Sequence, residues 1–79
     1  MDGSLEQWLA EDIERLRVRE ADNLMTMRLL RKRFESLFGN TDNTEKLENI
    51  MQVYYSYKSL NVQIAELMAK VDDQLTRLS

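Results

Sequence analysis

Residues 44–78, TEKLENIMQVYYSYKSLNVQIAELMAKVDDQLTRL, decide the fold of this chain. Their apolar residues recur at alternating steps of three and four, with one polar interruption at Asn61. This heptad repeat is typical of a helix that packs along one line, or seam, against another helix. The seam positions are Leu47, Ile50, Tyr54, Tyr57, Asn61, Ile64, Met68, Val71, Leu75 and Leu78.

Residues 5–38 carry a second heptad and predict a first long helix. Two of its middle seam positions, Glu20 and Asn23, are polar. Ser4 and Gln7 have capping-box spacing, so we expect Ser4 to cap this helix after a short tail. Gly39 is expected to end it in a left-handed conformation. The seam positions of this helix are Leu9, Ile13, Leu16, Glu20, Asn23, Met27, Leu30, Phe34 and Leu37.

The polar segment 39–43 reads as the only loop. Asp42 with Glu45, or alternatively Thr44, is expected to cap the helix that follows. Two long helices joined by so short a loop are antiparallel neighbours, and facing residue numbers then add to about 84. This register places Asn23 opposite Asn61, where the two amides either pair with each other or contact water. The predicted fold is therefore an all-α antiparallel two-helix hairpin, one domain over residues 1–79.

The composition suits long helices, but the chain is too short for two helices to bury a large core. The chain has 79 residues, no Pro and two Gly. A chain of this length buries only about 60% of its unfolded surface. We therefore expect the hairpin to be completed by dimerisation or by a partner protein.

Several apolar residues lie outside the seam and are candidates for that contact. A two-helix seam uses two positions per heptad, whereas a wider apolar stripe is typical of a larger bundle. Isolated exposed apolar residues are ordinary, but the seven-residue spacing of one set favours a protein-binding surface. The candidate protein-binding residues are Trp8, Leu24, Phe38, Val53, Leu60 and Leu67, with Met51, Tyr55 and Val62 adding further apolar surface.

No pattern of residues predicts catalysis. The chain has no His and no Cys, which removes the commonest general base and the thiolate metal ligands. Adjacent acids such as Asp72 and Asp73 point to different sides of a helix and do not form a catalytic pair. We therefore expect no enzyme activity, catalytic residue, cofactor, metal or small-molecule substrate.

The basic residues concentrate in one segment. Residues 15–33 hold seven of the eleven basic residues and two acids, a net charge of +5 in a chain of net charge −3. Arg15, Arg17 and Arg19 alternate around a helix, and aromatic residues are not interleaved among them. A solvated surface or a patch for an acidic protein is therefore favoured over RNA binding.

Particular segments resemble a known family. The chain opens with Leu5-Glu6-Gln7-Trp8-Leu9, has Leu29-Leu30-Arg31-Lys32-Arg33-Phe34 near the end of the first helix, and then a Gly39-Asn40 turn. In these features it resembles the YscE-like co-chaperones of the bacterial type III secretion needle. The resemblance implies a cytoplasmic hairpin that, with a tetratricopeptide-like chaperone, keeps the needle subunit unpolymerised.

The needle subunits themselves offer a second resemblance. Asp42-Asn43-Thr44-Glu45-Lys46-Leu47 is similar to their turn and second helix, as are Tyr55-Ser56-Tyr57 and Asn61-Val62. Thr44 stands where they usually have proline, and the dense charge of residues 5–38 departs from them.

Three functions follow as hypotheses. The leading one is a non-enzymatic interaction module, a small chaperone or assembly subunit of a type III secretion-like system in the cytoplasm. The alternatives are a self-assembling needle-type subunit and a dimeric hairpin that binds RNA through residues 15–33. We expect no signal peptide, because Met1-Asp2-Gly3-Ser4 is not basic and no apolar region follows it, and no apolar run approaches the length of a membrane span.

Overall fold

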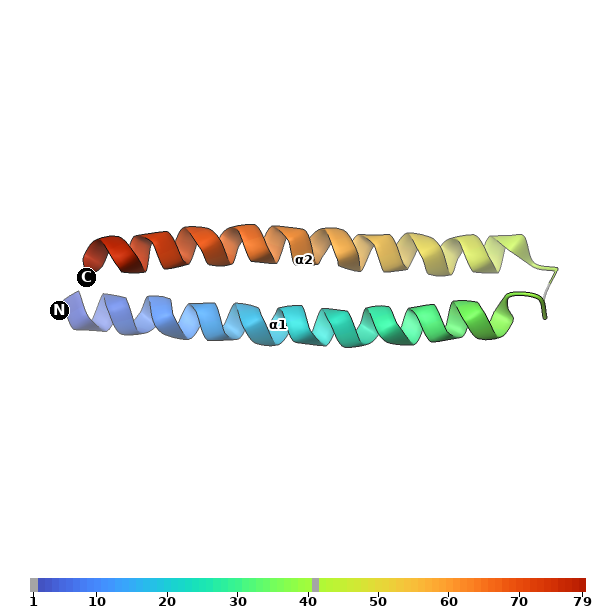
Figure 1. Ribbon diagram of the computed structural model, residues 1–79, viewed down its shortest axis with the longest axis horizontal. Coiled ribbons are helices and arrows are strands. Elements are labelled where there is room, and N and C mark those ends of the chain that lie inside the picture. The colour runs from blue at the N-terminus through green and yellow to red at the C-terminus, as the bar shows by residue number, and fades with distance from the viewer. Residues whose placement is uncertain (1, 41) are drawn as a thin grey trace.

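The protein is a hairpin of two long helices. The computed structural model describes the backbone of residues 2–40 and 42–79, and the side chains of residues 4–40 and 42–79. Helices α1 (Asp2–Leu37) and α2 (Thr44–Leu78) lie side by side and antiparallel, with both termini at one end and the connection at the other (Figure 1). The molecule measures 60 × 14 × 12 Å. The predicted all-α hairpin is confirmed.

The start of α1 differs from the prediction. Ser4 does not cap the helix, because α1 already begins at Asp2 and Ser4 lies within its first turn. Gln7 makes no capping box either. Its side-chain amide donates instead to Glu11 Oε1 at 3.2 Å, one helical turn further on. Of the predicted tail, Met1 lies outside the described residues.

The connection between the helices is built largely as predicted. Gly39 has φ +86°, the left-handed conformation that ends α1, and the N–H of Asn40 donates to Leu37 O at 3.0 Å. The cap of α2 is neither Asp42 nor Thr44. Asn43 precedes the helix, and its side-chain oxygen accepts from the N–H of Lys46 at 3.1 Å. Thr41, which belongs to the predicted loop, lies outside the described residues.

The predicted seam is the core. All nine seam positions of α1 and nine of the ten in α2 are buried or half-buried, and the most buried are Leu16, Met27 and Val71. Leu78 is the exception, with 41% of its surface exposed. The register places polar Glu6 opposite it at the open end of the hairpin, so Leu78 has no apolar partner there.

The two asparagines of the seam pair as the register predicts. Asn23 Nδ2 donates to Asn61 Oδ1 at 2.9 Å, and Asn61 Nδ2 donates to the backbone oxygen of Glu20 at 3.2 Å. Both side chains are half-buried. Because a slipped register would place each amide against apolar carbon, this layer favours one alignment of the helices.

Candidate protein-binding surface

The hairpin exposes more surface than a compact protein of its size. A monomer of 9.4 kDa has an accessible area of about 5,000 Å² by the usual scaling with mass. This chain exposes 6392 Å². The difference of about 1,400 Å² exceeds the roughly 800 Å² that one partner contributes to a standard protein interface. Each helix has only one neighbour, so its other sides remain open.

One exposed apolar surface lies on α2 and consists of Val53, Leu60 and Leu67, which we call the leucine face. Their exposed fractions are 44%, 46% and 47%. Seven-residue spacing places them in a line on the same side of the helix. Leu60 and Leu67 border a groove between the helices whose other walls include Leu16 and Arg19 of α1.

A second exposed surface lies on the opposite side of the seam, and we call it the aromatic face. The ring of Phe38 stacks on Phe34 with centroids 5.8 Å apart, and Phe34 lines a depression with Met51 and Tyr55. Leu24 borders the adjoining depression, beside Tyr54. The exposed members of the aromatic face are Leu24, Phe38, Met51, Tyr55 and Val62.

Trp8 belongs with neither cluster. Its side chain is 54% exposed, and the guanidinium of Arg15 lies 5.6 Å from the centre of its ring. Steps of three and four residues place Trp8, Arg15 and Arg19 along one strip of α1, on the side of the leucine face. Trp8 lies near the open end of the hairpin, so the structure does not bring it together with Leu24 and Phe38.

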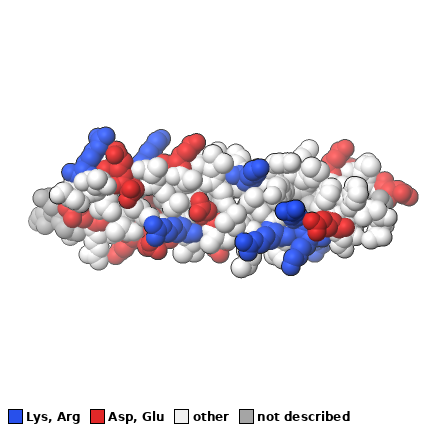
Figure 2. All heavy atoms as spheres, in the orientation of Figure 1, with Lys and Arg blue, Asp and Glu red and all other residues white. Residues whose placement is uncertain are grey.

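Charge is distributed in three zones along the hairpin. In the antiparallel register, residues 15–33 of α1 lie beside residues 51–69 of α2. This middle zone holds eight basic and three acidic residues, a net charge of +5, so the two ends together carry −8. Figure 2 shows basic side chains gathered over α1 on one side of the middle and acidic side chains towards both ends. The leucine face lies entirely within the basic middle zone.

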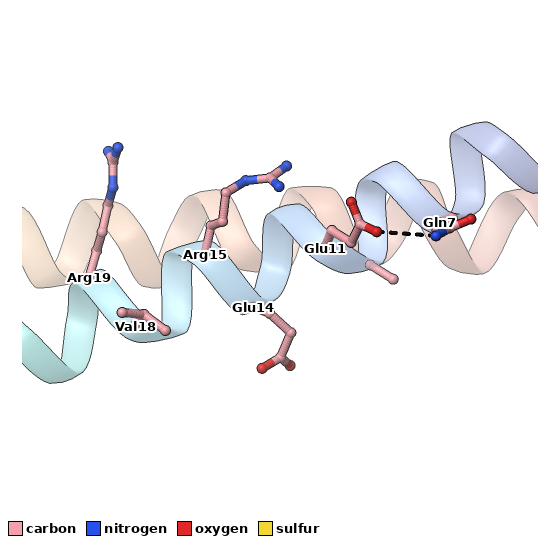
Figure 3. A pocket seen from close by; sticks show the side chains of 7 residues that line it. Gln7, Glu11, Glu14, Arg15, Val18 and Arg19 are labelled. Carbon is pink, nitrogen blue, oxygen red and sulfur yellow. Dashed lines mark hydrogen bonds between the residues drawn. The ribbon is translucent and has the colours of Figure 1, made fainter.

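The basic side chains differ in whether they have an acidic partner. Arg15, Arg17 and Arg31 form ion pairs with acids one turn away on α1, at 3.5, 2.8 and 3.3 Å. Among the side chains that the structure describes, Arg19 and Arg33 form no ion pair. Figure 3 shows Arg15 and Arg19 extending to the same side of α1, whereas Glu14 points to the other side.

The described part of the chain contains no group of three acidic side chains placed to hold a metal ion. The hollow drawn in Figure 3 is lined by one helix alone, with Glu11, Glu14, Arg15 and Arg19 around Ala10 and Val18. A surface formed by a single helix encloses no ligand. Within the described residues, neither helix has the length and apolarity needed to cross a membrane.

The fold and exposed faces define the protein as an antiparallel helical hairpin with apolar surface on both sides of its seam. Compared with protein-family models, curated proteins and solved structures, the chain matches none of them.

All six predicted protein-binding residues are exposed. Met51, Tyr55 and Val62, which the sequence assigned to further apolar surface, join Leu24 and Phe38 on the aromatic face. The structure also adds two residues that the sequence pattern did not assign to the site. Arg19 and Arg33 flank the leucine face from α1. Their signal is a spacing of fourteen residues, two heptads, which equals that of Val53 and Leu67.

Proposed function

We propose that this protein is a non-enzymatic interaction module whose hairpin presents its exposed apolar faces to a protein partner. In this role it acts as a small chaperone or assembly subunit of a type III secretion-like system in the bacterial cytoplasm. The observation that carries the proposal is the line of Val53, Leu60 and Leu67, half-exposed at heptad spacing on a helix whose seam is already occupied.

The energetics of the leucine face support binding. Full burial of a leucine side chain contributes roughly 1.5–3 kcal/mol. Each member of the face is a little under half exposed, so covering the three contributes about 3 kcal/mol in total. The seam already holds the backbone of α2 in place. Binding of a partner to the leucine face therefore costs little free energy for ordering that backbone.

The segments that resemble the needle co-chaperones support the more specific role. Leu5-Glu6-Gln7-Trp8-Leu9 lies in the first turns of α1, and the Gly39-Asn40 turn ends that helix. The hairpin that the resemblance implies is the fold observed. A co-chaperone that keeps a subunit unpolymerised needs an apolar surface available to another chain, and both faces of this hairpin are available.

The test is capture of partners from the native organism with three variants. Leu60→Asp places a charge on the leucine face, Val62→Asp places one on the aromatic face, and Ser59→Asp is the matched control on the outer side of α2. We expect loss of the partner with Leu60→Asp or Val62→Asp and retention with Ser59→Asp. Circular dichroism checks that each variant keeps its helices.

Two results would contradict the proposal. If all three variants capture the same proteins as the unmodified chain, neither face is a binding surface. If light scattering over a concentration series shows growth into filaments, the protein is a self-assembling subunit of the needle type.

A further inference from the structure

The leucine face combines an apolar line on α2 with basic side chains on α1. From residue 53 to 67, the strip of α2 beside the seam consists of uncharged residues: Val53, Ser56, Leu60, Gln63 and Leu67. Arg19 lines the groove with Leu60 and Leu67. Arg33 lines the groove nearer the loop, together with Lys46. Asp22 of α1 also lines the groove beside Arg19. An occupant therefore meets apolar carbon along α2 and, along α1, two arginines and one acid, a net charge of +1.

The dimensions of this surface fit a helix. Val53 and Leu67 are fourteen residues apart on α2, which is about 21 Å of helix axis. Arg19 and Arg33 are fourteen residues apart on α1 and therefore span the same length. A third helix of about four turns, lying along the groove, contacts all three members of the leucine face and reaches both arginines.

The charge of the middle zone argues against a second copy as the occupant. The zone covers residues 51–69 of α2, so its centre is at Leu60. A two-fold axis through Leu60, or one parallel to the hairpin, brings Arg19 and Arg33 of both copies to one interface. Arg28 and Arg31 line the aromatic face and do not take part. Like charges placed opposite each other suppress such an association. A dimer shifted by one heptad keeps only two of the three members of each apolar line in contact and so buries less apolar surface.

The chemistry of the face argues against a nucleic acid as well. Phosphates would satisfy Arg19 and Arg33 but would leave Leu60 and Leu67 in water. Single-stranded nucleic acids bind largely through stacking of bases on aromatic rings. The residues that line this groove in the described structure include no aromatic ring.

We propose that the leucine face binds an acidic amphipathic helix of a partner protein, with apolar residues against Val53, Leu60 and Leu67 and carboxylates near Arg19 and Arg33. This inference rests on the proposed function and names the chemistry of the partner. The carboxylates of that helix lie two heptads apart, matching the spacing of the two arginines.

The experiment uses two fluorescein-labelled helical peptides of 21 residues as probes. Both carry leucine at two positions per heptad. One has Glu at the flanking positions and the other has Lys. Fluorescence anisotropy with the full chain at low salt is expected to show binding of the Glu peptide at least about tenfold tighter than binding of the Lys peptide, with the difference shrinking as salt is added.

Variants assign the binding to the leucine face. Leu60→Asp is expected to weaken binding of the Glu peptide at least about tenfold, because Leu60 contacts the apolar side of the peptide. Ser59→Asp is expected to weaken it less than about twofold, because Ser59 lies on the outer side of α2. The double variant Arg19→Glu/Arg33→Glu is expected to reverse the preference between the peptides. Arg19→Gln/Arg33→Gln is expected to abolish the preference without reversing it.

The following outcomes overturn the inference. Absence of peptide binding, equal binding of both peptides, or an unchanged preference in the double variants removes the acidic helix as occupant. A dimer in sedimentation equilibrium that Leu60→Asp dissociates and Ser59→Asp does not assigns the face to a second copy. Binding of a labelled 20-nucleotide uridine RNA that survives Leu60→Asp but not Arg19→Glu/Arg33→Glu assigns the arginines to nucleic acid.

The proposed function fails separately from this inference. If the partner captured from the native organism is lost with Leu60→Asp but retained with Arg19→Glu/Arg33→Glu, the interaction module stands and the acidic helix does not. If the partner is retained with Leu60→Asp and with Val62→Asp, the proposed function fails as well.

Discussion

The pairing of Asn23 with Asn61 leads to a quantitative prediction about the stability of the hairpin. Replacing Asn61 by Ala removes two hydrogen bonds, one to Asn23 at 2.9 Å and one to the backbone oxygen of Glu20 at 3.2 Å. Replacing Asn23 by Ala removes only the first. The two single variants and the double variant form a thermodynamic cycle that isolates the direct bond between the amides.

The expected magnitudes follow from the geometry. A hydrogen bond of this kind contributes about 1 kcal/mol net to the free energy of unfolding. Asn→Ala also raises helix propensity by roughly 0.5 kcal/mol, which partly masks the loss. We therefore expect Asn61→Ala to cost about 1.5 kcal/mol and Asn23→Ala about 0.5 kcal/mol, with a coupling energy of about 1 kcal/mol. The change in propensity cancels in the coupling energy.

Urea unfolding followed by circular dichroism measures all four proteins. Asn49→Ala is the matched control, because Asn49 is exposed on the same helix and its replacement measures the gain in propensity alone. Light scattering at the same concentration checks that the variants keep the same association state. A coupling energy below about 0.3 kcal/mol, within the error of such cycles, would show that the two amides do not depend on each other.

Three further substitutions test the core, the turn and the cap by the same urea assay. Leu16→Ala, at a side chain only 7% exposed, is expected to lower the free energy of unfolding by about 2–3 kcal/mol. The control Leu29→Ala, at a side chain 61% exposed, is expected to change it by less than about 0.5 kcal/mol. Equal effects of the two substitutions would mean that the seam is not the core. Gly39→Ala is expected to lower the free energy of unfolding by about 1–2 kcal/mol. The positive φ alone causes this loss, because no atom lies within 4 Å of an added Cβ. An unchanged midpoint of urea unfolding would refute the left-handed turn. Asn43→Ala is expected to lower the free energy of unfolding by about 1 kcal/mol and to speed hydrogen exchange of the Lys46 amide. The control Asn43→Asp keeps the cap. Unchanged exchange in the alanine variant would exclude Asn43 as the cap.

The seam was predictable from the sequence because its repeat constrains both helices at once. A register in which Leu30 faces Tyr54 also brings Asn23 to Asn61, so one constant places the whole core. Gly39 was predictable for a similar reason, because few other residues adopt a positive φ without cost. The seam depends on the spacing of apolar residues, and the turn depends on the residue type that best tolerates a positive φ. Both can be read from the sequence directly.

The ends of the helices and the division of the exposed residues were harder to predict. Asp42, Asn43 and Thr44 are all good caps, and the choice depends on the path of the loop rather than on the residue types. The position of Trp8 relative to Leu24 depends on which side of the seam each occupies and on their distance along the axis. Spacing along one helix shows which residues share a side, but the groove beside Arg19 forms only when α2 packs against α1.

The place of the asparagine layer has a consequence for how the chain folds. Closing the layer of Leu37 and Leu47 joins residues ten apart, whereas closing that of Leu9 and Leu75 joins residues 66 apart. The entropy of closure grows with this separation, so pairing is expected to start at the turn and to proceed towards the termini. Asn23 and Asn61 occupy the fifth of nine layers. A misaligned pair of helices that starts at the turn therefore meets an unpaired amide halfway along, before the second half of the core has formed, and separates while separation is still fast.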